Sequence, residues 1–263
     1  MLKKEKETGG VSQPRLRLES CRFENGVWKI DAEQAKHLVK VRRCYNGSVV
    51  EGLLDGEKIE LRLENCETEE ICAVELSRTK EKKAAREIQL LLALLKNDQF
   101  DEALRFAAET GVSEIYLLAC ERSVPKITDR LGGKMTRWNK ILAEATKQSG
   151  AATPPVLHEP VPFEKFDFPA VCAEKYAALL AENAQPLARI AFGEKTALAI
   201  GPEGDWTPEE TRRLLAEGFV PVSLGNRILR ASTAVAVGCG WLGNAENQEA
   251  MTIKTNDLKK QLR

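Results

Sequence analysis

Two glycine-marked loops near the C-terminal end contain the residues best suited to bind a ligand. The first is Gly201-Pro-Glu-Gly204, and the second is centred on Leu224-Gly225. Glycine lets a backbone approach a ligand closely, so exposed amides and carbonyls in these loops can hydrogen-bond an adenine edge or a ribose. Leu224, Ile228 and Leu229 would supply apolar walls. The two loops therefore predict one binding pocket.

Two other interpretations of these loops are open. Ordinary turns between the strands and helices of an α/β domain also use glycine. A phosphate-binding loop is disfavoured because neither Gly-x-x-x-x-Gly-Lys-Ser/Thr nor Gly-x-Gly-x-x-Gly opens a helix. Glu203 and Asp205 would also repel a pyrophosphate. An unrelated nucleotide-binding enzyme would need such a phosphate site, so this interpretation is the weakest.

Strand and helix signals flank both loops. The apolar run Ala197–Ile200 stops at the first loop, as a buried parallel strand does when the chain leaves the sheet. Thr207-Pro-Glu-Glu210 has the hydroxyl cap, proline and glutamate that open a helix, and Gly218 closes it. Phe219–Leu224 then returns to the sheet. Ligands of parallel sheets bind outside the carboxyl ends of the strands, where both loops would lie.

The rest of the chain after residue 86 alternates strands with helices, which predicts an α/β class with a parallel sheet. The expected strands are 88–95, 115–119, 196–200 and 220–224, with another near 170–173, and the expected helices are 100–110, 136–149 and 232–242.

The N-terminal part instead contains short strands and reads as a small β-barrel. Strands are expected near residues 16–18, 27–30, 48–54, 59–63 and 71–76, with a hairpin turn at Asp55-Gly56 and a helix over 32–40 capped by Asp31. The predicted organisation is a flexible arm (1–13), the barrel (14–77), a charged linker (78–86), the α/β domain (87–246) and a polar tail (247–263).

Composition narrows the class of protein. The 39 basic and 39 acidic residues balance, so contact with a nucleic acid must come from local basic patches. Seven scattered cysteines and two histidines predict reduced thiols and no metal site. Apolar runs long enough to span a membrane are absent from the sequence, and the first ten residues are charged. We expect a cytoplasmic protein without a membrane partner.

The paired loops also carry a resemblance to a known family. Gly201-Pro-Glu-Gly204, followed by Ser223-Leu-Gly-Asn-Arg-Ile-Leu-Arg230 and Thr233-Ala234, resembles the signature of the RsmE family of SPOUT-class ribosomal RNA methyltransferases. Further matches are His37-Leu38, Val41-Arg-Arg43, Lys96, Glu109-x-Gly111-Val112, Glu121-Arg-Ser123 and Arg137-Trp138. The resemblance extends over nearly the whole chain.

The resemblance implies a PUA-like RNA-binding β-barrel followed by a SPOUT α/β domain whose C-terminal part forms a trefoil knot around S-adenosylmethionine. It implies a homodimer that methylates N3 of a uridine in 16S ribosomal RNA of the small ribosomal subunit. It also implies that the cofactor pocket is lined by Leu198, Ile200, Gly201, Gly204, Leu224, Gly225, Ile228 and Leu229.

Arg230 and Glu203 are the candidate catalytic residues. Arg230 can hold an RNA phosphate or stabilise a uridine anion, or it can bond carbonyls within the knot. Glu203 can act as a base, or it can serve as a cap or as a partner for an arginine. For RNA binding, the family match singles out Arg43, Arg122 and Arg137.

The chain departs from the family pattern at Asp205, Ser232 and Ala151. The family usually has a glycine, a glutamate and an arginine at these positions. The departures leave an alternative open, which is a non-catalytic RNA-binding or ribosome-assembly protein that keeps the knotted fold.

Overall fold

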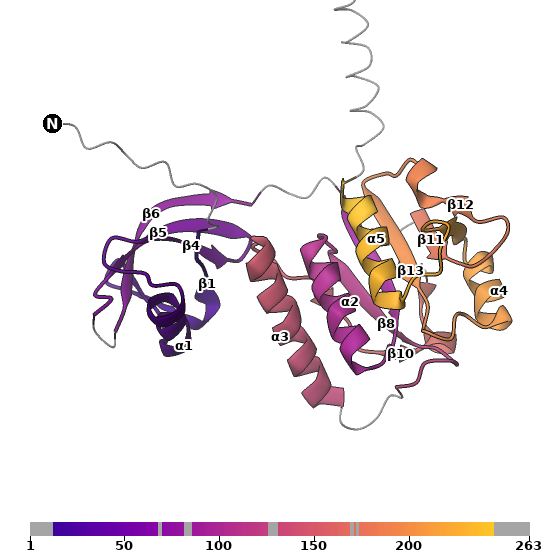
Figure 1. Cartoon of the computed structure of the whole chain (residues 1–263), viewed down its shortest axis with the longest axis horizontal. Helices are drawn as coiled ribbons and strands as arrows, with labels where there is room; N and C mark the ends of the chain where they lie inside the picture. Colours follow the sequence, from indigo (N-terminus) through magenta and orange to yellow (C-terminus); the bar gives the residue numbers. More distant parts are fainter. Residues whose placement is uncertain are drawn as a thin grey trace, which may run out of the picture. The chain divides into compact units, whose positions relative to one another are not determined.

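The computed structural model describes residues 13–67, 70–81, 86–125, 131–168, 171 and 174–244. Two compact units divide them (Figure 1). One contains the described residues up to 81 together with Gly150–Thr153, and the other contains the rest. The predicted arm and polar tail lie outside the described residues, except for Gln13 of the arm. Among the described residues, no helix is long and apolar enough to cross a membrane.

The N-terminal unit is built on one six-stranded sheet in the order β1-β4-β5-β6-β3-β2. The strands are β1 (Arg15–Arg17), β2 (Arg22–Glu24), β3 (Val27–Lys29), β4 (Val49–Leu54), β5 (Glu57–Glu64) and β6 (Cys72–Lys80). Helix α1 (Ala32–Lys36) continues into a π-helical turn at His37–Val41. Only the β1–β4 pair is parallel among the pairs of this sheet.

Two local predictions for this unit are confirmed. Asp55 and Gly56 both have positive φ, at 46° and 76°, which is the conformation of a two-residue hairpin turn between β4 and β5. The Asp31 carboxylate accepts hydrogen bonds from the backbone amides of Glu33 and Gln34, so it caps α1 as expected.

The last strand of the N-terminal unit, β6, is longer than the sequence predicted. The sequence placed the domain limit at residue 77 and a linker at 78–86, but β6 continues to Lys80, which pairs with Glu57. Arg78 lies on this extension and bonds the carboxylates of Glu57 at 2.7 Å and Glu75 at 2.9 Å. Charged residues looked like a linker because their ion pairs across the sheet are invisible in the sequence. Strand β2 was not predicted at all.

The C-terminal unit is a parallel sheet in the order β10-β8-β7-β13-β11-β14-β12, with β9 beside β8. Its strands are β7 (Glu87–Ala93), β8 (Glu114–Ala119), β9 (Val156–Leu157), β10 (Val161–Pro162), β11 (Glu174–Ala178), β12 (Gln185–Pro186), β13 (Lys195–Ile200) and β14 (Val220–Ser223). Its helices are α2 (Asn97–Glu109), α3 (Leu131–Ser149), α4 (Pro208–Ala216) and α5 (Ala231–Asn244). The α/β class is confirmed.

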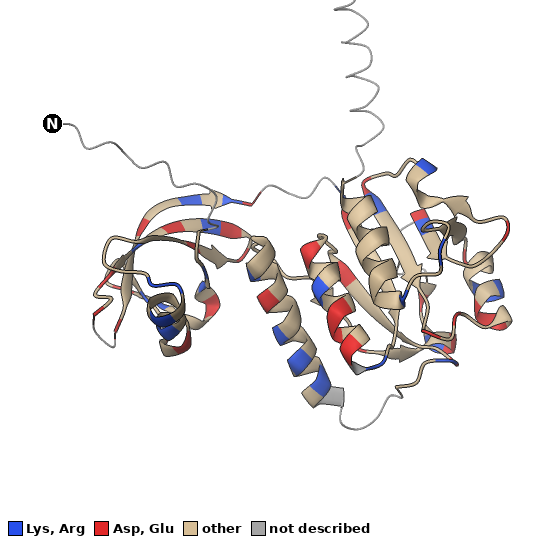
Figure 2. Ribbon diagram, in the orientation of Figure 1, with Lys and Arg blue, Asp and Glu red and all other residues tan. Residues whose placement is uncertain are grey.

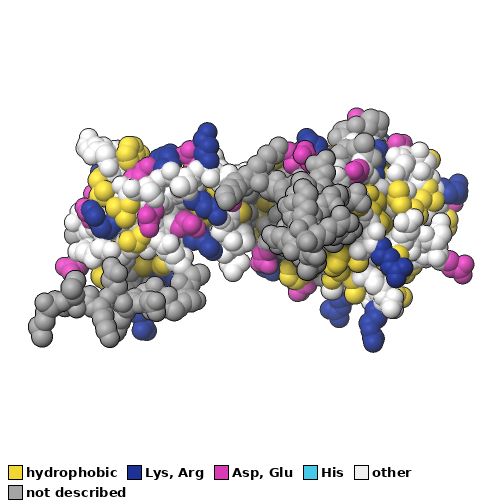
Figure 3. All heavy atoms as spheres, turned by 90° about the horizontal axis from the view of Figure 1, so that it is seen from above, with side chains coloured by type: hydrophobic (Ala, Val, Ile, Leu, Met, Phe, Trp, Pro, Cys, Tyr) yellow, Lys and Arg dark blue, Asp and Glu magenta, His cyan; other side chains and the backbone are white. Residues whose placement is uncertain are grey.

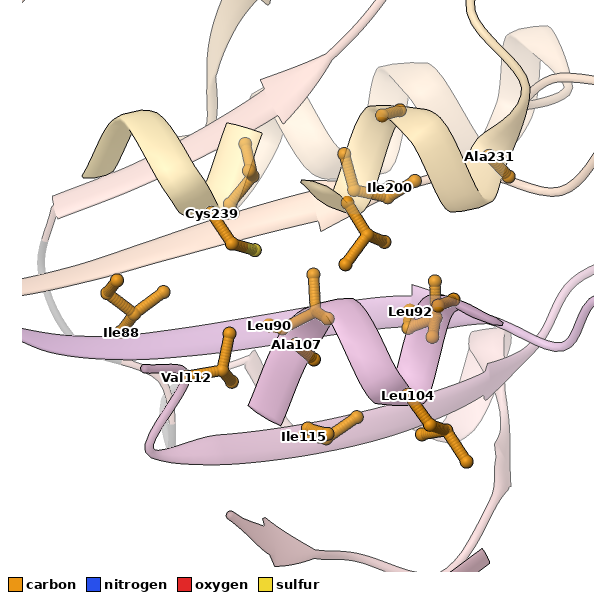
Figure 4. Close-up of a cluster of buried hydrophobic side chains, with 14 of the residues drawn as sticks. Ile88, Leu90, Leu92, Leu104, Ala107, Val112, Ile115, Ile200, Ala231 and Cys239 are labelled. Atoms are coloured by element: carbon orange, nitrogen blue, oxygen red, sulfur yellow. The ribbon is translucent and has the colours of Figure 1, made fainter. Parts of the chain in front are cut away.

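The central strands bury both faces. Leu90 and Leu92 of β7 point into a core with residues of α2, α3 and α5, three helices that lie side by side in Figure 1. Figure 4 shows part of this core. Leu91 and Ala93 point to the opposite core, which contains Trp206 and residues of α4. Continuous apolar runs are typical of parallel strands covered on both sides, because successive side chains alternate between faces.

Strands of two to five residues escaped prediction in the segment before β13. Of residues 170–173, where a strand was expected, the structure describes only Val171, which is in no strand. The strand of this region, β11, begins at Glu174 and pairs with both β13 and β14. Glu174 and Lys175 interrupt its apolar pattern, so the signal for this strand in the sequence is weak.

A buried arginine joins three segments of the C-terminal unit. Arg86, only 3% exposed, precedes β7 and donates to the carbonyls of Phe192 at 3.1 Å, Gly193 at 2.6 Å and Leu242. Burial lowers its pKa from the ordinary value. These bonds tie the start of β7 to the approach of β13 and to the end of α5.

We expect Arg86→Met to lower the free energy of unfolding by about 2–4 kcal/mol, because it leaves buried carbonyls without donors. Urea unfolding followed by circular dichroism measures the change. Lys195→Met is the control, since it removes a solvent-exposed pair with Glu87 at 2.7 Å and should cost under about 1 kcal/mol. Equal losses for the two variants would contradict the anchoring role.

Candidate functional site

A pocket of about 400 Å³ lies where strands β11, β13 and β14 end. Its wall is formed by the residues that follow each strand and by the first turns of α2 and α5. The lining residues are Gln99, Ala178, Leu179, Leu180, Ile200, Gly201, Pro202, Glu203, Asp205, Val222, Ser223, Leu224, Gly225, Arg227, Ile228, Leu229, Arg230, Ala231 and Ala234. The two glycine-marked loops therefore meet in one pocket, as the sequence predicted.

The first loop, residues 201–206, is held by its own hydrogen bonds. The Asp205 amide donates to the Pro202 carbonyl at 2.9 Å, and the Trp206 amide donates to the Asp205 carboxylate at 2.8 Å. Trp206 is buried beneath Gly201, where a Cβ would lie 2.8 Å from the indole nitrogen. A larger residue at position 201 would clash with Trp206, so this close packing requires glycine. Without a side chain, the Gly201 backbone itself lines the pocket.

Helix α4 follows this loop and fixes its end. Thr207 and Glu210 form a capping box, as predicted from the sequence. The second oxygen of the Glu210 carboxylate accepts the Glu121 amide at 2.9 Å. The helix start, the first loop and the segment after β8 are thus connected by buried hydrogen bonds.

The second loop, residues 224–230, is more open. Gly225 has φ 137°, a conformation that L side chains rarely adopt, and no atom lies within 4 Å of where its Cβ would be. The hydroxyl of Ser223 donates to the Gly225 carbonyl at 3.0 Å. Ile228 is 80% exposed, so a large apolar side chain borders the pocket without a cover. This wall suits a flat apolar group such as an aromatic base.

Six of the eight predicted cofactor residues line the pocket, namely Ile200, Gly201, Leu224, Gly225, Ile228 and Leu229. The other two do not. Leu198 is fully buried in the core that α5 covers. Gly204 faces Arg122, whose Cβ lies 3.2 Å from the position of a glycine Cβ. Strand alternation explains Leu198, because it points to the same face as Ile200 but lies one pair of residues deeper in the sheet.

The two candidate catalytic residues both line the pocket. Arg230 is exposed, and its guanidinium has no partner among the described residues. Glu203 is also exposed, and one of its carboxylate oxygens accepts the Lys96 amide at 2.9 Å, at the N-terminal end of α2. This hydrogen bond ties the first loop to the residue that precedes α2.

Two of the three arginines predicted to bind RNA make contacts within the unit. Arg122 donates to the carbonyls of Gly204 at 2.9 Å and Trp206 at 3.3 Å, so it holds the first loop. Arg137 of α3 pairs with Asp101 of α2, with one hydrogen bond of 3.0 Å. Arg43 belongs to the other unit, where it is exposed and has φ 56°.

The sequence did not reveal several lining residues. Gln99 of α2 contributes a side-chain oxygen that is buried and accepts no hydrogen bond from the described residues. Ala178 ends β11, the strand that was predicted too early, and Leu179 and Leu180 follow it. Tertiary packing brings α2 and β11 to the pocket, and no motif in their own sequences predicts that they line it.

The two described cysteines of this unit, Cys120 and Cys239, do not contribute a nucleophile. Burial raises the pKa of the Cys120 thiol, and burial likewise raises the pKa of Cys239. Both thiols stay protonated at neutral pH and are not disulfide-bonded. Among the described residues, no group of histidine, cysteine and carboxylate side chains could hold a metal ion.

Arg122→Met should loosen the first loop, because it removes two hydrogen bonds from a charged donor. We expect amide hydrogen exchange at residues 203–206 to accelerate by roughly tenfold or more, measured by mass spectrometry. Arg137→Met is the control, since its partner lies on α2 and exchange at 203–206 should not change. Unaltered exchange in Arg122→Met would show that the loop does not depend on this side chain.

Comparison with known proteins finds related sequences and structures. A family model described as an RNA methyltransferase domain matches residues 81–243. Ribosomal RNA small subunit methyltransferase E 2 of Borreliella burgdorferi is 31% identical over 229 residues, which cover 82% of this chain and 90% of the relative. The enzyme named ribosomal RNA small subunit methyltransferase E in Synechocystis is 35% identical, but the match spans 57% of this chain and half of the relative.

Solved structures show the same fold. The ribosomal RNA small subunit methyltransferase E of Neisseria gonorrhoeae, bound to S-adenosyl methionine, has a TM-score of 0.76 and 25% identity, covering 88% of this chain and 96% of that one. A putative methyltransferase of Legionella pneumophila in complex with the same cofactor has a TM-score of 0.77 and 26% identity, covering 88% and 97%. The resemblance seen in the paired loops is confirmed, and the chain belongs to the ribosomal RNA small subunit methyltransferase E family.

Proposed function

We propose that this chain is an S-adenosylmethionine-dependent methyltransferase that acts on N3 of a uridine in 16S ribosomal RNA. The observation that carries the proposal is the pocket at the ends of β11, β13 and β14, formed by the two loops that match the family. Relatives named for this activity, and a related structure with the cofactor bound, support it. Such an enzyme works where ribosomes are made, in the cytoplasm.

The lining residues fit the cofactor. Leu224, Ile228 and Leu229 give an apolar wall for the adenine, and the backbones of Gly201 and Gly225 are open to hydrogen bonds from its edge or the ribose. Gln99 also lines the pocket, and its side-chain amide can form hydrogen bonds with the hydroxyl and amino groups of the cofactor. When bound, S-adenosylmethionine supplies a methyl group on a positively charged sulfur.

This chain's side chains would handle the charge on the uridine. The N3 nitrogen is a weak acid whose proton must leave before or as the nitrogen attacks the methyl group. We infer that Arg230 stabilises the resulting anion, since it is the pocket arginine in the matched motif and its guanidinium has no partner among the described residues. Glu203 also lines the pocket, and its second carboxylate oxygen can accept the proton.

RNA contact would extend over both units. We propose that the N-terminal unit is the PUA-like barrel, with Arg43 and the exposed aromatic side chains Tyr45 (72% exposed) and Phe23 (55%) available to RNA. Basic residues also recur along α3, together with an acidic residue (Figure 2). On the face drawn in Figure 3, basic and acidic side chains are interspersed. Recognition would therefore depend on local groups rather than on a large positive field.

We also propose the knot and the dimer implied by the family. Support for the knot is the path of the chain, since α5 follows β14 and packs back on β13 and β7 in the middle of the sheet. Support for the dimer is α5 itself, where Val237 (42% exposed) and Trp241 (46% exposed) lie uncovered on an almost wholly apolar helix.

The alternative function is a non-catalytic RNA-binding or assembly protein with this fold. The departures from the family favour it, because Ser232 bonds Glu102 at 3.2 Å instead of supplying a carboxylate of its own. Transfer of a tritiated methyl group into small ribosomal subunits that lack the modification separates the two functions. The enzyme incorporates label at one uridine, located by mass spectrometry, whereas the alternative incorporates none while RNA binding persists.

Arg230→Met should lower kcat by roughly 100-fold or more in this assay, because it removes the group that stabilises the anion, and Arg230→Lys should retain part of the rate. Cofactor affinity, measured by calorimetry, should change little. Arg43→Glu is the contrasting variant, and we expect it to raise KM for the subunit with kcat preserved. An unchanged kcat in Arg230→Met would exclude this catalytic role.

Trp241→Glu should convert the dimer into a monomer, since it places a charge in an apolar interface. Sedimentation velocity measures the mass, and circular dichroism verifies that the variant is folded. Leu180→Glu is the control, since it changes another exposed apolar side chain of the same unit (68% exposed), and the mass should stay at two chains. A monomeric wild type would overturn the proposed dimer.

A further inference from the structure

Four charged side chains line the pocket, and they differ in burial. Glu203, Arg227 and Arg230 are exposed, whereas Asp205 is half-buried. The remaining lining residues are uncharged. Water and salt screen an exposed charge more than a partly buried one, so the charge of Asp205 is the least screened of the four.

The backbone holds the Asp205 side chain in place. Its φ of 62° lies in the left-handed region, which few residues other than glycine adopt and which aspartate and asparagine tolerate. One carboxylate oxygen accepts the amide of buried Trp206 at 2.8 Å. The other oxygen has no partner among the described residues. The carboxylate is therefore fixed at the pocket wall and retains an oxygen for a ligand.

The other carboxylate of the pocket is less suited to this task. Glu203 is exposed, and one of its oxygens is engaged by the Lys96 amide at 2.9 Å. The two arginines have the opposite charge and would repel a cation. Asp205 is thus the side chain through which the pocket can favour a positive group.

The proposed reaction changes the charge of the cofactor. The bond between sulfur and the methyl carbon breaks, the sulfur keeps the electron pair and becomes neutral, and N3 of the uridine forms the new bond to carbon after losing its proton to a base. The substrate cofactor therefore carries a positive sulfur that the product, S-adenosylhomocysteine, lacks. The two molecules are otherwise alike.

Given the proposed function, on which this inference rests, we propose that Asp205 is a specificity-determining residue that makes the pocket prefer the cationic cofactor over its neutral product. The carboxylate faces the positive sulfur and attracts it. The attraction disappears when the methyl group is transferred, so the product binds less tightly and leaves. Asp205 thereby limits inhibition by the product.

Calorimetry with S-adenosylmethionine and S-adenosylhomocysteine tests this role. Asp205→Asn removes the charge but keeps the tolerated backbone conformation and the acceptor for Trp206. We expect it to weaken S-adenosylmethionine binding by roughly three- to tenfold, with binding of the product unchanged. Glu203→Gln is the matched control, and it should alter the ratio of the two affinities by less than about twofold.

A second variant separates loss of the Asp205 charge from a disturbance of the loop backbone. Asp205→Gly removes the carboxylate and suits the left-handed backbone, so it should reduce the ratio as Asp205→Asn does without lowering the melting temperature. A ratio that stays the same in both variants, including equal weakening of the two ligands, would overturn the role of Asp205 alone. If the wild type bound neither ligand, the proposed function itself would fail.

Discussion

The pairing of β13 in the middle of the parallel sheet is the constraint on which the site depends. This strand lies between β7 and β11, so its backbone is bonded on both sides. Its alternating side chains serve both cores, with Leu198 and Ile200 beneath α5 and Ala197 and Ala199 toward α4. This pairing sets where β13 ends, and the residue that follows the strand, Gly201, lines the pocket.

The small residues around this strand follow from the same constraint. Gly238 of α5 packs on Leu198, where a Cβ would approach the leucine within 2.6 Å. Gly201 is required by Trp206 in the same way. Close packing on both faces thus fixes α5, which Arg230 immediately precedes, and the loop that carries Asp205 relative to one strand. Rigid support of this kind is what a binding site needs to hold its groups in position.

Charged residues near the pocket divide into those that build it and those that face it. Arg122, Glu210 and one oxygen of Glu203 bond backbone groups and hold the loops. Arg227 and Arg230 have no such partner among the described residues and remain available to a ligand. A matched motif does not distinguish these roles, because an arginine suits a carbonyl as well as a phosphate.

The sequence by itself determined the elements that depend on neighbours along the chain. The cap at Thr207, the hairpin at Asp55-Gly56 and the apolar runs of β7 and β13 are local signals, and the paired loops identified the family. These features were predictable because turns, caps and buried strands each impose their own residue pattern.

Tertiary structure decided what depends on contacts between distant segments. Gln99 reaches the pocket only because α2 packs beside α5, and β11 is a strand because β13 and β14 pair with it on both sides. Arg122 became a support for the first loop through carbonyls more than eighty residues away. Hydrogen bonds between segments so far apart leave no periodic trace in the sequence, since the partners are chosen by the fold.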